Sequence, residues 1–299
     1  MKSGIINIYK EKGYTSFDVV AKMRGILKEK KIGHTGTLDP DAEGVLPVCI
    51  GKATKLCDLL TDKDKEYETV LLLGKTTDTQ DITGQVLSET EAAVTEDEVR
   101  SVVMSFVGGY DQLPPMYSAL KVNGQKLCDL ARKGMEVERK PRHVELFSIE
   151  ILKITLPRVR MRVHCSKGTY IRTLCRDIGE RLSCGGCMES LLRTRVERFE
   201  LKDAVRLGEL ERLASEGMAE SVLLPVDRMF SELPARTVLP AFRKLSDNGN
   251  ALRESHLCAS PDAGRTERVR IYDDSGRFVG IYEFRKDQKL YKPIKIFLE

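Results

Sequence analysis

Residues 33–51 read GHTGTLDPDAEGVLPVCIG and carry the strongest local signal in the chain. Polar side chains gather among four glycines and two prolines, and the segment then passes into an apolar run typical of a buried strand. Asp39 precedes Pro40, whose ring disfavours the helical region for the residue before it. We therefore expect a long ordered loop that holds the Asp39 carboxylate on a stiff, extended turn.

Three interpretations of this loop can be compared with the expectation that it binds a ligand. A phosphate-binding P-loop is excluded, because the motif around Gly51-Lys52 requires a glycine where Leu46 stands. An aspartate that only hydrogen-bonds loop amides is the structural alternative. A divalent metal for phosphoester hydrolysis stays a weaker alternative, because no second ligand cluster supports the oxygen and nitrogen donors of His34, Asp39, Asp41 and Glu43. The glycines and the histidine favour a loop that contacts a ligand.

The segments on either side of this loop predict helices and strands in mixed order. A helix is expected from Ser16, as its cap, to about residue 28, with Phe17 on the apolar face. Thr95 and Glu98 form a capping box for a second helix that ends near Gly108. Residues 67–73 and 159–165 read as strands. Because there is no strict β-α-β rhythm, we expect an α+β fold with a largely antiparallel mixed sheet.

A third helix is predicted after the strand that ends at Cys165. A turn containing Gly168 leads into it, and its apolar residues recur at helical spacing. This arrangement places Tyr170 and Arg172 at a strand-to-helix junction.

The character of the chain changes near residue 236. Short strands are expected at 268–272 and 278–284, joined by the turn 273–276. We predict two domains: residues 1–235, in which 113–143 form a projecting arm, and a small β-rich domain at 236–299.

Composition places the chain among ordinary globular proteins. Hydrophobic residues make up 41% and charged residues 31% of the 299 residues, with a net charge of +4. No apolar run is long enough for a bilayer, and the first residues show no secretory signal, so we expect a cytoplasmic protein with no membrane contact. The spacing of Cys184 and Cys187 suggests zinc only weakly, because no second cysteine or histidine pair accompanies it. Reduced, buried thiols and no metal are the expectation.

The charge is unevenly distributed. Between residues 121 and 143 there are seven basic and three acidic residues, so this stretch is a candidate phosphate-binding arm; on charge alone, a solvated face of helix and loop is at least as good an interpretation. The residues predicted to contact a phosphate backbone are Lys121, Arg132, Lys133 and Arg142.

Several segments, in order, resemble the TruB family of tRNA pseudouridine synthases. They are residues 33–56, 65–84 (KEYETVLLLGKTTDTQDITG), 113–134 (LPPMYSALKVNGQKLCDLARKG), 165–182 (CSKGTYIRTLCRDIGERL) and 191–199 (LLRTRVERF). Together they span most of the first 200 residues. The C-terminal strands resemble, less specifically, the PUA-like RNA-binding domain of such enzymes.

The resemblance implies a pseudouridine synthase fold and the isomerisation of uridine to pseudouridine at position 55 in the T-loop of tRNA, without a cofactor. It makes Asp39 the nucleophile and Arg172 the cation beside it. Tyr67 and Tyr170 become pocket residues around a flipped uracil, Leu191 its apolar wall, and His34 the side chain that fills the space the base leaves. If Tyr67 removes the C5 proton, Arg172 is expected to supply the supporting field. The family often has an arginine and a glycine where Leu192 and Glu197 stand, which leaves phosphate contacts there in doubt.

The expected partner is the tRNA T-arm, with no obligatory protein partner, and we expect a monomer. Two rivals stay open: a guide-RNA-dependent enzyme of the archaeal and eukaryotic type, and an RNA-binding protein without catalysis. The short C-terminus without a lysine-rich tail favours the stand-alone form, and the joint presence of Asp39, Tyr67 and Arg172 argues against a silent protein.

Overall fold

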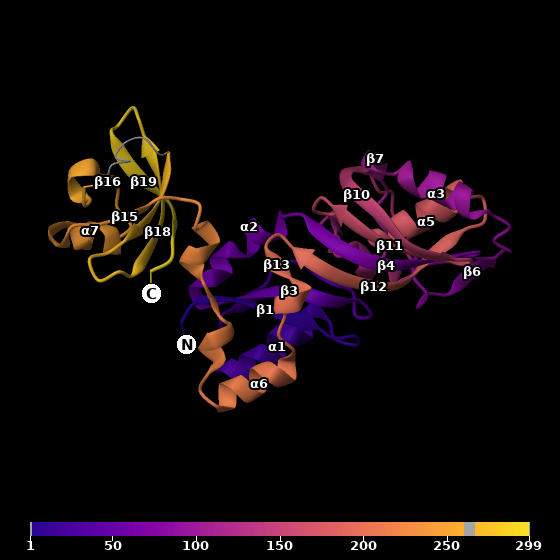
Figure 1. Ribbon diagram of the computed structural model, residues 1–299, viewed down its shortest axis with the longest axis horizontal. Helices are drawn as coiled ribbons and strands as arrows, with labels where there is room; N and C mark the ends of the chain where they lie inside the picture. The colour runs from indigo at the N-terminus through magenta and orange to yellow at the C-terminus, as the bar shows by residue number, and fades with distance from the viewer. Residues whose placement is uncertain (1, 260–266, 299) are drawn as a thin grey trace.

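The computed structural model describes residues 2–259 and 267–298, in which a large sheet and a small one account for most of the strands (Figure 1). The large, ten-stranded sheet runs β14-β1-β3-β12-β4-β11-β10-β7, with β2 paired to β3 and β13 to β12. Its pairings are antiparallel apart from β12 with β3. The predicted α+β class with a largely antiparallel mixed sheet is confirmed.

The strands of the large sheet are β1 (Gly4–Lys10), β2 (Ile32–His34), β3 (Glu43–Ile50), β4 (Lys65–Leu73), β7 (Gly108–Gln112), β10 (Arg142–Thr155), β11 (Arg158–Cys165), β12 (Gly186–Val196), β13 (Phe199–Glu200) and β14 (Leu224–Pro225). Two separate hairpins are β5 (Lys75–Thr77) with β6 (Val86–Glu89), and β8 (Lys121–Val122) with β9 (Gln125–Lys126). The helices are α1 (Ser16–Leu27), α2 (Cys57–Thr61), α3 (Glu96–Met104), α4 (Leu127–Ala131), α5 (Ile171–Arg181), α6 (Leu207–Ser215) and α7 (Arg243–Asp247).

Two of the predicted helices differ from expectation at their ends. Thr15, not Ser16, caps α1, since its side chain accepts from the Asp18 amide in a full capping box. Phe17 is 63% exposed, so its predicted place on the buried face is wrong. The capping box of Thr95 and Glu98 is confirmed for α3, but this helix stops at Met104, because the chain turns there into β7.

The loop predicted at residues 33–51 is shorter than expected. Strands β2 and β3 take up both of its ends, which leaves residues 35–42 irregular. Gly44 explains why a glycine stands inside β3: its φ is +106°, and a Cβ there would lie 2.2 Å from the backbone oxygen of Arg193 on β12. The glycine therefore lets the two parallel strands approach, and Asp39 lies just before this contact.

The C-terminal part is rich in strands, as predicted. Its five-stranded sheet runs β15-β17-β18-β19-β16, formed by β15 (Ala235–Thr237), β16 (Leu252–Arg253), β17 (Arg268–Tyr272), β18 (Phe278–Arg285) and β19 (Leu290–Ile296). It has a core of its own, and Phe278 and Phe297 pack on Phe230 of the preceding segment. The domain boundary at 235/236 stays a prediction, and residues 260–266 and 299 of the predicted domain lie outside the described residues.

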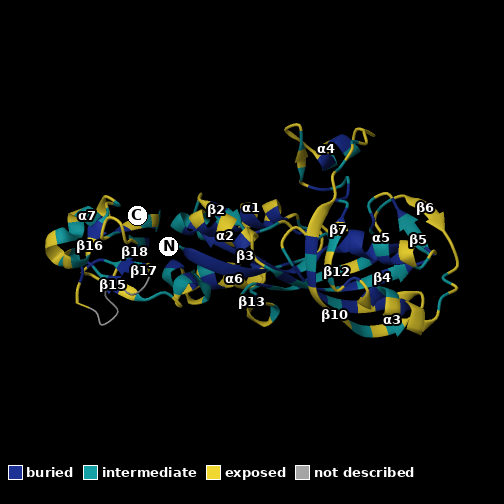
Figure 2. Ribbon diagram, turned by 90° about the horizontal axis from the view of Figure 1, so that it is seen from above, coloured by how far each residue is buried: buried dark blue, intermediate teal, exposed yellow. Residues whose placement is uncertain are grey.

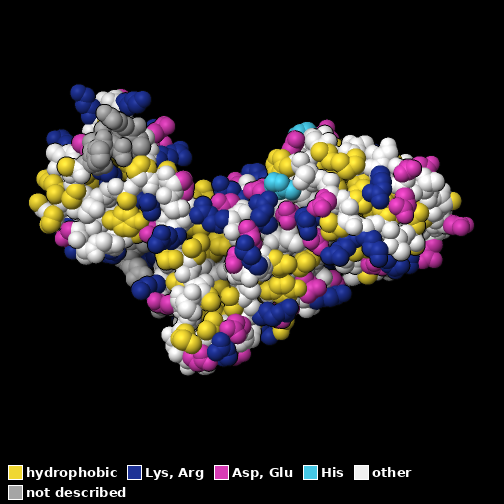
Figure 3. All heavy atoms as spheres, in the orientation of Figure 1, with side chains coloured by type: hydrophobic (Ala, Val, Ile, Leu, Met, Phe, Trp, Pro, Cys, Tyr) yellow, Lys and Arg dark blue, Asp and Glu magenta, His cyan; other side chains and the backbone are white. Residues whose placement is uncertain are grey.

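The arm predicted at 113–143 contains the hairpin β8–β9 and helix α4, which project from the body (Figure 2). Leu127 and Leu130 of α4 are buried within it. Over the face seen in Figure 3, basic and acidic side chains are interspersed, and the surface is hollowed between the C-terminal part and the body. Within residues 2–259 and 267–298, no helix is both long and apolar enough to cross a membrane.

Candidate active site

Asp39 lies on a tight turn in the irregular segment between β2 and β3. The Ala42 amide donates to the Asp39 carbonyl at 3.1 Å and closes the turn, while the Gly13 amide donates to the Pro40 carbonyl at 2.9 Å. Leu38, the residue before Asp39, is buried, and its amide donates to Ser16 Oγ at 2.9 Å. The Asp39 side chain is still 38% exposed, so the turn presents the carboxylate at the edge of the core.

Arg172 meets this carboxylate from the first turn of α5. Its Nη2 lies 3.2 Å from Oδ1 and 3.1 Å from Oδ2 of Asp39, and also donates to the Tyr117 carbonyl at 2.8 Å. Nη1 donates to the Thr79 carbonyl at 3.3 Å. Because the Arg172 side chain is only 7% exposed, these contacts fix the guanidinium in one place. The predicted pairing of Asp39 with a cation therefore has its geometry, although its chemical role stays a prediction.

A second carboxylate, which the sequence reasoning did not single out, lies behind Arg172. Asp81 Oδ2 is 3.9 Å from Arg172 Nη1, and Asp81 Oδ1 accepts from the hydroxyls of Thr79 and Thr83 and from the Thr83 amide. Burial raises the pKa of Asp39, Arg172 opposes that rise, and Asp81 adds to it. Arg172 is thus shared between two acids, and Asp39 is easier to protonate than an ordinary aspartate.

Tyr67 is buried on β4, and the cation beside it is Arg193 rather than Arg172. The two residues are direct partners on neighbouring strands, so the charge of the buried Arg193 guanidinium lies beside the Tyr67 side chain. Burial raises the pKa of Tyr67 to about 12, against the lowering effect of Arg193. The prediction that Arg172 supplies the field at Tyr67 is therefore corrected, because β12 places a different arginine there.

Tyr170 ends the turn before α5 and is held through its backbone. The buried side chain of Gln112 accepts from the Tyr170 amide at 2.7 Å and donates to the Tyr170 carbonyl at 3.0 Å. Burial raises the pKa of Tyr170, and the nearby charges of Arg172 and Arg142 oppose this. Gln112, a second residue that the sequence reasoning missed, thereby fixes the start of the helix that carries Arg172.

Leu191 and His34 are the two remaining residues that the resemblance assigns to the pocket. Leu191, on β12, packs with Tyr67 and Leu38 in the same apolar cluster. His34 ends β2, and its Nδ1 accepts from the Gly36 amide at 3.3 Å. Burial, followed by the charge of Arg193, lowers the pKa of His34, which favours the neutral ring. The roles predicted for both side chains stay predictions.

Two buried cations anchor the Asp39 segment, and neither was predicted. Lys10, at the end of β1, donates through Nζ to the carbonyls of Ala42 at 2.5 Å and Pro40 at 3.0 Å. Arg193 donates through Nε to the Val45 carbonyl at 2.7 Å and through Nη2 to the Gly36 carbonyl at 3.3 Å. Burial lowers the pKa of Lys10 to about 8. Because Lys10 binds carbonyls that follow Asp39 and Arg193 binds one on each side of it, the loop is fixed on both sides of Asp39.

The four basic residues predicted to contact RNA are all exposed. Lys121, Arg132 and Lys133 lie on the projecting arm, while Arg142 begins β10 at its base. Arg132 is 3.5 Å from Asp129, an exposed pair worth little to stability. A role in RNA binding stays a prediction.

The described residues hold no group of three or more His, Cys, Asp or Glu side chains arranged for a metal ion. Thus His34, Asp39, Asp41 and Glu43 do not assemble into the alternative metal site. Cys184 and Cys187 are buried free thiols.

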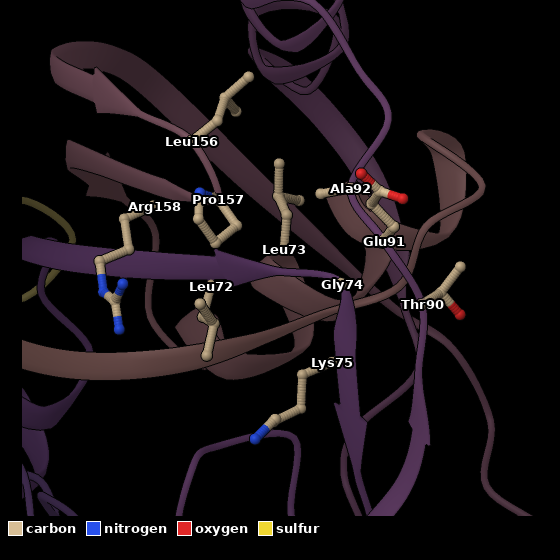
Figure 4. A pocket seen from close by; sticks show the side chains of 10 residues that line it. All are labelled: Leu72, Leu73, Gly74, Lys75, Thr90, Glu91, Ala92, Leu156, Pro157 and Arg158. Atoms are coloured by element: carbon tan, nitrogen blue, oxygen red, sulfur yellow. The ribbon is translucent and has the colours of Figure 1, made fainter.

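A hollow elsewhere on the surface does not belong to the Asp39 site. It is lined by residues 72–75, 90–92 and 156–158, with Gly74 and Pro157 near its centre (Figure 4). Leu73 lies six residues beyond Tyr67 on β4, which at ~3.3 Å per residue separates the two by about 20 Å.

The chain is similar to known proteins over almost its whole length. Residues 24–171 match the family description "TruB family pseudouridylate synthase (N terminal domain)", and residues 172–231 match "tRNA pseudouridylate synthase B C-terminal domain". A protein named tRNA pseudouridine synthase B from Lachnoclostridium phytofermentans is 56% identical over 99% of this chain and all of its own length. One of the same name from Alkaliphilus oremlandii is 46% identical over 98% of this chain and 97% of its own.

A solved structure shares the fold. The chain aligns with one titled "Crystal Structure of a Cbf5-Nop10-Gar1 Complex" at a TM-score of 0.71 and 27% identity, covering 99% of this chain and 85% of the other.

Proposed function

The chain belongs to the TruB family of pseudouridine synthases, and on this premise we propose that it isomerises uridine to pseudouridine at position 55 in the T-loop of tRNA, with Asp39 as the nucleophile. The single observation that best supports this proposal is the Asp39–Arg172 pair at 3.1 Å on a rigid turn. A nucleophilic carboxylate must be ionised although partly enclosed, and a fixed guanidinium favours that form.

The reaction sets clear demands on the protein. The bond from N1 of uracil to the ribose C1′ breaks, the base turns, and C5 bonds to C1′ while its proton leaves and N1 gains one. No oxidation state changes and no water is consumed, so we expect no cofactor. Asp39 is proposed to hold the base or the sugar while the glycosidic bond is open, and Tyr67 is proposed to take the proton from C5.

A uridine within a folded T-loop has to leave its stack to reach Asp39, so base flipping is part of the proposal. Tyr170 and Tyr67 offer aromatic faces to the flipped base, and Leu191 offers an apolar wall. The packing of Leu191 against the apolar cluster that contains Tyr67 supports this. His34, held neutral at the start of the loop, is proposed to enter the space left in the RNA.

The arm supports RNA binding because it presents Lys121, Arg132 and Lys133 on a projection that extends from the site, with Arg142 at its base (Figure 2). The C-terminal sheet is proposed as a PUA-like RNA-binding domain. We further propose that the protein acts as a monomer, without a protein partner, on tRNA in the cytoplasm. Whole-length similarity to proteins named tRNA pseudouridine synthase B supports the stand-alone form over a guide-RNA-dependent one.

The test is incubation of the purified chain alone with an unmodified tRNA transcript, followed by mapping of pseudouridine. We expect one new pseudouridine, at position 55, and the same product on an isolated T-arm stem-loop. Product only after addition of a guide RNA and partner proteins would favour the guided enzyme. Tight RNA binding with no product under any condition would favour a silent RNA-binding protein.

A further inference from the structure

We propose that Arg193 is a positioning residue of this site, which holds the Tyr67 hydroxyl and the Asp39 segment together and stabilises the Tyr67 phenolate as it takes the C5 proton. The inference rests on the proposed function, because it assigns a task within that reaction. Arg193 lies in the segment LLRTRVERF, whose only predicted contributor to the site is Leu191.

The strand register brings Arg193 to this task. On β12 it faces Tyr67 of the antiparallel strand β4, and on its other side it pairs with Gly44 of the parallel strand β3. Its Nε and Nη2 bind the carbonyls of Val45 and Gly36, which flank the Asp39 turn. The same side chain is the cross-strand neighbour of the buried Tyr67 side chain. One rigid side chain therefore fixes the distance between the nucleophile segment and the phenol.

The burial of this charge is unusual. Arg193 is 1% exposed, and none of the ion pairs found among residues 2–259 and 267–298 includes it. Burial of a cation without a carboxylate is costly, even when carbonyls accept its hydrogen bonds. A neutral hydrogen-bond donor would be enough to bind the two carbonyls. The positive charge is explained if an anion forms next to the guanidinium during catalysis.

The charges around Tyr67 agree with this role. Lys10, Lys65 and Arg193 form a buried cationic group, and the acid facing the tyrosine is Asp39 from the loop, with the Cys165 thiol of β11 as a further neighbour. His34 also faces Arg193. Arg193 is the cation of this group that the strand register places directly opposite Tyr67, so it provides the largest part of the stabilisation.

The proton count closes without another reactant. Tyr67 first releases its hydroxyl proton, which reaches N1 through solvent, and the phenolate is held by Arg193. After the C5–C1′ bond has formed, the phenolate takes the proton from C5 and becomes a phenol again. Uracil thus gains one proton at N1 and loses one at C5.

The experiment compares Arg193→Lys and Arg193→Gln with the unchanged chain in single-turnover assays. The RNA is a T-arm stem-loop carrying hydrogen or deuterium at C5 of the target uridine. We expect pseudouridine formation to slow by about 10- to 100-fold in Arg193→Gln, the range given by loss of one charge-assisted hydrogen bond, and less in Arg193→Lys. In both variants a deuterium isotope effect on product formation should appear or grow, because C5 deprotonation becomes limiting. Arg195→Lys, on the same strand but paired with Asp64, is the matched control and should change neither quantity.

The isotope effect separates chemistry from structure. A slower variant with an unchanged isotope effect would overturn the proposal, because a merely structural loss affects every step alike. Should Arg193→Gln fail to fold, Arg193→Lys alone decides the matter, and a lower-pKa fluorotyrosine at position 67 should restore its rate if the phenolate is what Arg193 stabilises; no restoration counts against it. Absence of product from the unchanged chain would contradict the proposed function instead, so the two failures are distinct.

Discussion

Replacement of Arg172 by methionine should make activity depend on pH in a predictable direction. Arg172 contacts both oxygens of Asp39 through Nη2, at 3.1 and 3.2 Å, and it opposes the rise that burial imposes on the pKa of Asp39. Attack requires the ionised carboxylate. Without the cation the pKa of Asp39 moves further up, so the acid limb of the kcat/KM profile should move to higher pH.

The size of the effect follows from the contact. A hydrogen bond to a charged group contributes about 1.5–3 kcal/mol, and water around the 38% exposed carboxylate of Asp39 screens part of it. We therefore expect the lower part of that range, which moves the acid limb up by about 1 to 1.5 pH units and lowers kcat/KM on that limb by about 10- to 30-fold. Loss of the bonds to the carbonyls of Tyr117 and Thr79 adds to the deficit, but that addition does not depend on pH.

The assay is kcat/KM for a T-arm stem-loop from pH 5 to 9. Arg172→Lys should lie between the unchanged chain and Arg172→Met, because it keeps the charge but not the planar guanidinium. Arg176→Met is the control on the same helix, since Arg176 pairs with Asp177 and Glu180 and not with Asp39. An acid limb at the same pH in Arg172→Met and in the unchanged chain would refute the reasoning.

Three further predictions follow from named contacts. Asp39→Asn should raise the melting temperature at pH 8, because the pKa of Asp39 is raised in the folded protein and its ionisation therefore destabilises the fold. The gain in melting temperature should be present above that raised pKa and should vanish below the ordinary value of 3.8. Thermal melts across this pH range check the prediction. Gln112→Glu should lower both stability and kcat, because a carboxylate cannot donate a hydrogen bond to the Tyr170 carbonyl. Leaving that carbonyl unpaired costs about 1–3 kcal/mol. The control is Gln125→Glu at an exposed position, which should leave the free energy of unfolding unchanged in denaturant titrations. Replacement of Arg132 and Lys133 by glutamine should weaken binding to every T-arm sequence and reduce the slope of log affinity against log salt by about two, and an unchanged slope would mean that the arm is only a solvated face.

Much of the fold could be predicted from local patterns. The capping box at Thr95, the alternation in residues 159–165 and the helix after Gly168 are signals carried by adjacent residues, and they located α3, β11 and α5. The ends of elements were less predictable, because tertiary contacts decide them. Phe17 has helical spacing with buried residues, yet it lies at the exposed start of α1.

The candidate site divides in the same way. Asp39 was singled out by its loop and then by the family resemblance, Tyr67 and Arg172 by the resemblance alone, and the structure pairs Asp39 with Arg172. Lys10, Gln112 and Arg193 were missed because the partners that tie them to the site are backbone groups distant in sequence, which leave no periodic pattern. Asp81 was missed because its hydrogen bonds are to nearby threonines, while its link to the site is the distant Arg172. Arg193, and not the predicted Arg172, lies beside Tyr67 because of the register between β4 and β12, and no local sequence pattern encodes that register.

The role of Asp39 is tested most directly by Asp39→Asn on a T-arm stem-loop with tritium at C5 of the target uridine. Tritium release and RNA affinity are measured on the same preparation. We expect release to disappear while affinity stays within a few-fold of the unchanged chain, because the substitution removes the nucleophile but keeps size and polarity. Release near the unchanged rate would contradict the assignment of Asp39 as the nucleophile.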